Sequence, residues 1–103
     1  MHYVVFVTTK NADQAKRIAQ KLVANKLVAC VNIVSGIRSL FWWQGKVCHE
    51  KETLMIIKTK KSCFKKLVKA VKSLHSYTVP EIIALPIVEG NEDYLKWIDA
   101  SVA

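Results

Sequence analysis

The side chains best suited to chemistry in this sequence are its three cysteines and three histidines. Cys30, Cys48 and Cys63 lie 18 and 15 residues apart, a spacing that matches neither a paired metal knuckle nor a redox motif. Cys48 and His49 are adjacent, but neighbouring residues of a strand point to opposite faces and cannot chelate one ion together. We therefore expect three reduced thiols, with Cys30 packed in the core.

The sequence contains no local signature of an enzyme. Nucleophilic catalysis needs a nucleophile, a base and a third group that orients the base. The histidines and serines are scattered and show no such arrangement, so we expect no catalytic activity. His75 differs from the other histidines because it follows an expected helix end. It is either a ligand that faces a cleft or an imidazole stabilised by the helix dipole.

Length and composition indicate a single domain over residues 1–103. The chain is 51% hydrophobic, which excludes disorder and is sufficient for one core without cross-links. No apolar run approaches the roughly 20 residues that cross a bilayer, so we expect no membrane association. Residues 1–3 do not begin a secretory signal, and the predicted location is the cytoplasm.

The net charge of +8 is unevenly distributed. Residues 1–80 carry fifteen basic and three acidic side chains, whereas residues 81–103 carry one basic and five acidic side chains. A basic chain suggests nucleic acid as a partner, but the expected central strands lack the aromatic pattern of an RNA-recognition module. We expect no nucleic-acid binding. The lysine-rich helix face is then either simply solvated or a phosphate-binding surface.

The first elements are a strand and a helix. Residues 3–7 form a β-branched and aromatic run that is typical of a strand buried on both faces. Asn11 caps a helix predicted over Ala12–Ala24, with Gln14 in the position of a capping box. Asn25 is expected to end this helix in a left-handed conformation.

Two unusually long strands follow, at Leu27–Trp43 and Lys46–Lys60. Gln44-Gly45 joins them in a tight hairpin turn, and Ser35-Gly36 interrupts the first one with a bulge. Strands usually have roughly 5–6 residues, whereas each of these arms could span on the order of 50 Å. The arms are therefore longer than the body of so small a domain.

The tip of this hairpin, Phe41-Trp42-Trp43, places three large aromatic side chains in water if the chain is alone. Aromatic side chains of this size favour burial strongly. The arm either curls over its own core or is covered by further copies of the chain in a closed oligomer.

The remaining elements complete a familiar order. A second amphipathic helix over residues 64–74 follows Ser62 as its cap, and a strand over Val79–Val88 is confined to an edge by its prolines. Asn91 caps a short final helix. The order βαββαβ, with a long hairpin between the second and third strands, predicts a ferredoxin-like α+β fold.

Five motifs in this sequence together resemble the CutA divalent-cation tolerance family. The resemblance extends over essentially the whole chain and implies a compact trimer of ferredoxin-like subunits held together by the long hairpins. The motifs are Ala29-Cys30-Val31-Asn32-Ile33, Trp42-Trp43-Gln44-Gly45-Lys46, Glu52 before Lys58-Thr59, His75-Ser76-Tyr77 with Val79-Pro80-Glu81-Ile82-Ile83, and Tyr94-Leu95-Lys96-Trp97-Ile98.

The resemblance also implies a function. The family is linked to tolerance of copper and other divalent metals, and its trimer is similar to that of the PII signalling proteins. It thus implies binding of a metal, or of a small anionic ligand, in clefts between subunits; the alternative is a PII-like sensor that does not depend on metal. Carried over by position, the ligand-binding residues are Trp43, Glu52, Lys58, Tyr77 and Glu81, and the metal ligand is His75.

The sequence departs from the family at the assigned copper ligands. These are a cysteine late in the first strand and two consecutive histidines before the tyrosine. Here Val7 and Leu74 occupy two of those places, so the chain resembles the copper-binding pattern only at His75.

Overall fold

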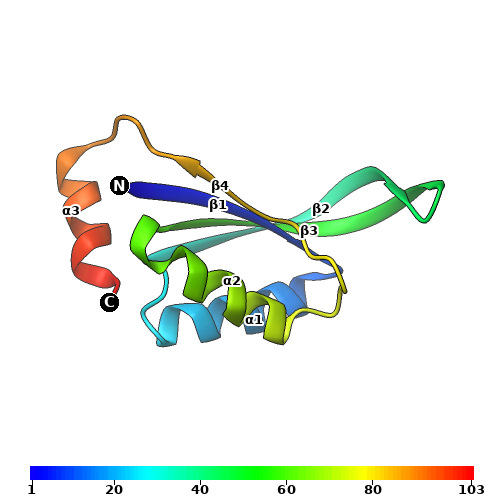
Figure 1. Ribbon diagram of the computed structural model, residues 1–103, viewed down its shortest axis with the longest axis horizontal. Coiled ribbons are helices and arrows are strands. Elements are labelled where there is room, and N and C mark those ends of the chain that lie inside the picture. Colours follow the sequence, from blue (N-terminus) through cyan, green and yellow to red (C-terminus); the bar gives the residue numbers. More distant parts are fainter.

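The β-branched N-terminal run forms β1 (His2–Thr9), the centre of a four-stranded sheet with the order β2-β3-β1-β4. β1 pairs antiparallel with both of its neighbours. The computed structural model describes residues 1–103 and shows α1 and α2 side by side on one face of this sheet, while α3 lies beyond its end (Figure 1). This is the predicted α+β arrangement βαββαβ with an additional C-terminal helix.

The first helix, α1, spans Ala12–Ala24 as predicted. The Asn11 side chain accepts a hydrogen bond from the Gln14 amide at 2.8 Å, whereas the Gln14 side chain accepts from the amide of Lys10 at 3.4 Å. The helix end differs from the prediction: Asn25 has φ −88, and the left-handed residue is Lys26, with φ 56. The turn is thus placed one residue later than the side-chain preference of asparagine indicates.

The long hairpin consists of β2 (Cys30–Trp43) and β3 (Lys46–Lys60). β2 begins three residues later than predicted. The register shifts between Val34 and Ile37, where Gly36 has φ 76, and this confirms the predicted bulge. Figure 1 shows the far half of the hairpin extending well past the helices, and the longest dimension of the molecule is 44 Å.

The second half of the chain contains two corrections. A short turn of 3-10 helix, η1 (Lys61–Cys63), precedes α2 (Phe64–Leu74), and neither has a side-chain cap. Ser62 lies inside that turn, so its predicted role as a cap is wrong. The last strand, β4, is limited to Ile82–Pro86, because it pairs with β1 only over that stretch.

The C-terminal helix α3 spans Glu92–Ser101. It begins as predicted, because the Asn91 side chain accepts a hydrogen bond from the Asp93 amide at 2.9 Å. His2 on β1 and Asp99 on α3 form an ion pair at 2.9 Å.

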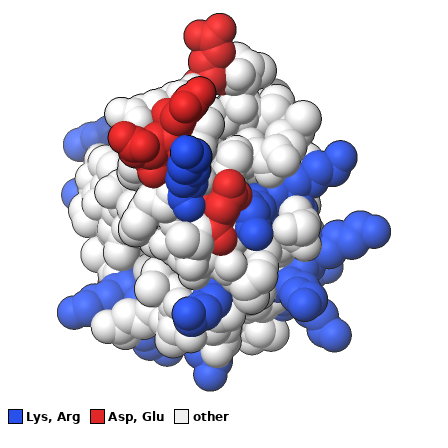
Figure 2. All heavy atoms as spheres, turned by 90° about the vertical axis from the view of Figure 1, so that its left-hand side faces the viewer, with Lys and Arg blue, Asp and Glu red and all other residues white.

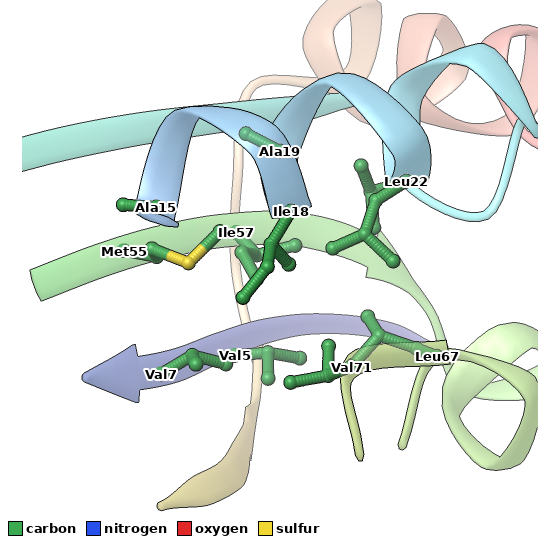
Figure 3. Close-up of a cluster of buried hydrophobic side chains, with 11 residues drawn as sticks. Val5, Val7, Ala15, Ile18, Ala19, Leu22, Met55, Ile57, Leu67 and Val71 are labelled. Carbon is green, nitrogen blue, oxygen red and sulfur yellow. The ribbon is translucent and has the colours of Figure 1, made fainter. Parts of the chain in front are cut away.

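The core lies between the sheet and the two helices (Figure 3). Val5 and Val7 of β1 point into it and are fully buried. Val4 and Phe6 alternate onto the opposite face and are only partly buried, so β1 is not buried on both faces within one chain. The buried cluster consists of Val5, Val7, Ala15, Ile18, Ala19, Leu22, Val28, Met55, Ile57, Leu67 and Val71.

The opposite face of the sheet carries no helix along most of its length (Figure 1). Several of its side chains are nevertheless apolar: Ile83 and Leu85 of β4 are 52% and 51% exposed, and Val34 of β2 is 42% exposed. We call this surface the open sheet face. None of the helices is long and apolar enough to span a membrane.

Candidate functional site

The centre of the candidate site is a hydrogen bond between Tyr77 and Glu52. The Tyr77 hydroxyl donates to Glu52 Oε2 at 2.7 Å. Glu52 is only 7% exposed, and it lies on β3 opposite Ile37, just past the bulge. Tyr77 belongs to the segment between α2 and β4. The pair therefore joins the middle of the hairpin to the segment that follows the second helix.

His75 holds Tyr77 in this position. Its Nε2 lies 2.7 Å from the carbonyl oxygen of Thr8, and its Nδ1 accepts a hydrogen bond from the Tyr77 amide at 3.0 Å. A carbonyl oxygen can only accept, so Nε2 carries the proton. The two rings also contact each other in a tilted arrangement, with their centroids 4.6 Å apart and their planes at 43°. Both ring nitrogens of His75 are thus engaged within the chain.

The charges around Tyr77 are negative. Burial raises the pKa of Tyr77 well above its usual range, and the hydrogen bond and charge of Glu52 and the charge of Glu50 add to this shift. The pKa of Glu81 is also raised, first by burial and second by the Glu52 charge. Three carboxyl groups thus act on one small region, and no Lys or Arg side chain forms an ion pair with any of them.

The structure brings together four of the six predicted site residues and separates the other two. Glu52, His75, Tyr77 and Glu81 are connected as described. Lys58 lies six positions from Glu52 along β3. Trp43 pairs with Lys46, which lies six positions from Glu52 in the opposite direction. Each separation is about 20 Å.

Lys58 has partners of its own. Its ammonium donates to the Asn32 side chain on β2. The Cys30 thiol is 3.8 Å from the same Asn32 oxygen, and Cys30 is the register partner of Lys58. Burial raises the pKa of Tyr94 on α3, with a further contribution from Cys30. Cys30 is therefore part of a polar group at the partly exposed end of β2 and not, as expected, a core residue.

The structure adds functional residues that the sequence analysis missed. Glu50 lies on β3 two residues before Glu52, and its charge acts on Tyr77. Thr8 contributes a backbone carbonyl, which no side-chain pattern reveals. The alternation of Glu50 and Glu52 on one strand face was the signal that could have identified the first of these.

One chain does not contain a complete metal site. No three His, Cys, Asp or Glu side chains lie close enough to hold one ion. Glu52 and Glu81 are two carboxylates of the candidate site, and the charge of Glu52 contributes to the raised pKa of Glu81.

Comparison with known proteins identifies the family of the chain. Residues 3–101 match the family described as "CutA1 divalent ion tolerance protein". The "Divalent-cation tolerance protein CutA" of Thermus thermophilus is 50% identical over 98 residues, which cover 95% of each chain. "Protein CutA 1, chloroplastic" of Oryza sativa is 51% identical over 98 residues, which cover 95% of this chain and 55% of that protein.

Solved structures show the same fold. The Thermus thermophilus "Divalent cation tolerance protein (Cut A1)" superimposes with a TM-score of 0.98 at 48% identity, with all of both chains covered. The "Periplasmic divalent cation tolerance protein CutA" of Archaeoglobus fulgidus gives a TM-score of 0.97 at 44% identity, again over all of both chains. The chain therefore belongs to the CutA1 divalent ion tolerance family.

Proposed function

We propose that this single-domain chain is a homotrimeric, non-catalytic protein of divalent-cation tolerance that binds copper, another divalent ion or a small ligand beside Tyr77 and Glu52. The observation that carries the proposal is family membership over residues 3–101. The printed names of its relatives refer to tolerance of divalent cations, and the acidic surroundings of Tyr77 suit a cation.

The exposed apolar surface of one chain supports a trimer. Trp42 at the hairpin tip is 74% exposed, and Ile83 and Leu85 on the open sheet face are about half exposed. Soluble monomers rarely leave so much contiguous apolar surface in water. In a closed ring the same interface is repeated between all copies. Further copies of the chain could therefore bury both the open sheet face and the hairpin tip.

The donor set beside Tyr77 suits a hard or borderline cation once a second subunit contributes. The pKa of Glu81 is raised first by burial and second by the Glu52 charge, and a bound cation would offset both effects. Carboxylates are common ligands of divalent ions. Since one chain lacks a third ligand, we infer that the remaining groups come from a neighbouring subunit.

His75 is a positioning residue in this proposal. A metal that takes His75 must displace either the Thr8 carbonyl or the Tyr77 amide from its ring. The earlier assignment of His75 as a metal ligand therefore requires a rearranged loop. We assign it instead to the orientation of Tyr77.

Two measurements test the proposal. Sedimentation is expected to give three times the chain mass of 11.7 kDa at micromolar concentration, and a monomer would contradict the proposed trimer.

Calorimetry with Cu(II), and separately with other divalent ions, is expected to show binding that Glu81→Gln weakens and that the control Glu89→Gln leaves unchanged. Equal affinity in both variants would show that Glu81 is not a ligand of the ion. The variant His75→Ala should abolish metal binding if His75 is a ligand, and should only weaken binding if His75 orients Tyr77.

A PII-like sensor that acts without metal is the second candidate. The group formed by Lys58, Asn32 and Cys30 favours it, because it presents an ammonium on the open sheet face, distant from the acidic site. An anionic metabolite bound there would raise the melting temperature of the trimer in the presence of a chelator. A Lys58→Met variant should lose that shift.

We also propose a cytoplasmic location. The printed names of the relatives differ in this respect, since the Oryza sativa protein is called chloroplastic and the Archaeoglobus fulgidus protein periplasmic. Fractionation of cells that produce the untagged chain tests the assignment.

A further inference from the structure

A second concave site lies where β3 passes into α2. It is a cavity of about 470 Å³ lined by Met1, Lys60, Lys61, Ser62 and Lys65. Figure 1 places this junction at the end of the molecule that carries α3 and the N-terminus, away from the hairpin tip. The cavity shares no lining residue with the Tyr77 site, so it requires a separate explanation.

The lining of the cavity is positively charged without compensation. Three of its five residues are lysines and none is acidic. The single ion pair of the chain joins His2 and Asp99, so none of these lysines is paired. Like charges around one concavity repel each other, and an anion that enters it removes the repulsion.

The helix starts at this junction bring no acidic side chain to the cavity. Lys61 and Ser62 belong to the 3-10 turn η1, and Lys65 to the first turn of α2. Neither element has a side-chain cap or an acidic residue in its first turn. The Phe64 amide bonds to the Lys61 carbonyl, so α2 continues directly from the turn. The Lys61 amide bonds to the Met1 carbonyl at 2.9 Å, which ties the turn to the start of β1.

Acidic and basic side chains are unevenly distributed at this end of the molecule. Figure 2 looks at this end and shows Asp and Glu side chains in its upper part and centre, with most Lys and Arg side chains around its lower part and sides. Asp99 of the acidic C-terminal segment is engaged with His2, and no acidic side chain lines the cavity.

We propose that the Lys60, Lys61 and Lys65 cavity is a binding site for a small phosphate-bearing anion. The lysine ammonium groups and the Ser62 hydroxyl are donors that phosphate oxygens accept from. A volume of about 470 Å³ falls within the roughly 300–1,000 Å³ of small-molecule sites, which is large enough for a diphosphate group and too small for a folded macromolecule.

Inorganic pyrophosphate is the probe for this site. Calorimetry on the full chain is expected to show saturable binding that the double variant Lys61→Gln/Lys65→Gln weakens by at least about tenfold. The matched control is Lys66→Gln/Lys69→Gln, which removes the same charge from the neighbouring α2 but touches no lining residue. This control should change the affinity by no more than about twofold. In amide NMR spectra the largest shifts should fall on Ser62 and Cys63.

Two results would overturn the proposal. Equal weakening by both double variants means diffuse attraction to a basic surface, and no saturation by millimolar pyrophosphate means that there is no site. Ser62→Asp provides an independent check, because a carboxylate at the start of a helix stabilises it while it repels an anion. We expect this variant to have a higher melting temperature than the wild type and to lose pyrophosphate binding. Retained binding in Ser62→Asp contradicts the proposed placement.

Discussion

At the scale of single residues, the contact between Tyr77 and Glu52 combines burial with negative charge. Glu52 is almost fully buried on a strand, and its hydrogen-bond donor from a side chain is the Tyr77 hydroxyl. A phenol beside a buried carboxylate resists ionisation, because its anion would face a second negative charge in a poorly solvated place. The pair is therefore both a structural contact and the electrostatic centre of the site.

Tyr77→Phe tests this contact. The variant leaves Glu52 without its donor, and we expect a loss of about 1–3 kcal/mol in the free energy of unfolding. The measurement is denaturant unfolding at pH 7, at a fixed protein concentration.

The same variant tests the pH dependence. The native pKa of Tyr77 is raised above its ordinary value, so its contribution to stability is complete below about pH 10. That contribution is lost as the pH rises further, through the native pKa. The wild type should lose stability above this pH more steeply than Tyr77→Phe, and parallel curves would contradict the assignment.

Glu81→Gln tests the repulsion between carboxylates. Because the native pKa of Glu81 is raised, the favourable contribution is present below its ordinary value and is lost as the pH rises through the native pKa. Glutamine cannot ionise, so the variant should gain stability relative to the wild type between about pH 4 and pH 7. Glu89→Gln is the control, since it makes the same change on an exposed turn. A Glu81→Gln curve parallel to the wild type would exclude the repulsion.

At the scale of elements, the hairpin turn retains one residue in an unfavourable conformation. Gln44 has φ 51 and Gly45 has φ 76, the pattern of a turn in which both central residues are left-handed. Glycine adopts this conformation freely, whereas glutamine does so at a cost.

Gln44→Asn should therefore stabilise the hairpin, because asparagine followed by glycine is the preferred pair in this turn. We expect a gain of about 0.5–1 kcal/mol in unfolding free energy, measured by thermal or denaturant unfolding. Gln44→Val, which is β-branched, should lose stability at the same position. If both variants change the free energy of unfolding in the same direction, the left-handed conformation of residue 44 does not determine the stability of the hairpin.

At the scale of the whole molecule, helices cover one face of the sheet and leave the other face open. The helices bury the face that carries Val5 and Val7, whereas Ile83 and Leu85 remain half exposed on the open sheet face. The variant Ile83→Lys tests whether another copy of the chain covers the open sheet face. If further copies cover it, the buried ammonium should dissociate the trimer, which sedimentation detects.

Val23→Lys is the matched control for this variant. Val23 lies on α1, in the helix layer on the other side of the sheet, and is similarly exposed. It should leave the assembly intact. A trimer that survives Ile83→Lys would show that the open sheet face is not the interface.

The sequence by itself determined the order and the kind of the elements. Helix periodicity, strand alternation, the bulge glycine and the hairpin glycine are local signals, and each acts through the residue's own backbone preferences. The two missed details at helix ends, at Asn25 and Ser62, were set by backbone hydrogen bonds and not by the capping side chain: the Leu27 amide bonds to the Leu22 carbonyl, and the Lys61 amide to the Met1 carbonyl. The strand that follows α2 was shorter than its apolar run because pairing partners, not composition, end a strand.

Only the tertiary structure decided which candidate residues meet. Register along β3 places Lys58 and the partner of Trp43 about 20 Å from Glu52, although all three lie in family motifs. The path of the segment after α2 brings Tyr77 onto Glu52, and the Thr8 carbonyl orients His75. The site around Tyr77 is therefore acidic and lacks the Lys58 ammonium that the family resemblance placed in it. Periodicity encodes which face a side chain occupies, but distance between elements depends on packing and register, and these exist only once the chain has folded.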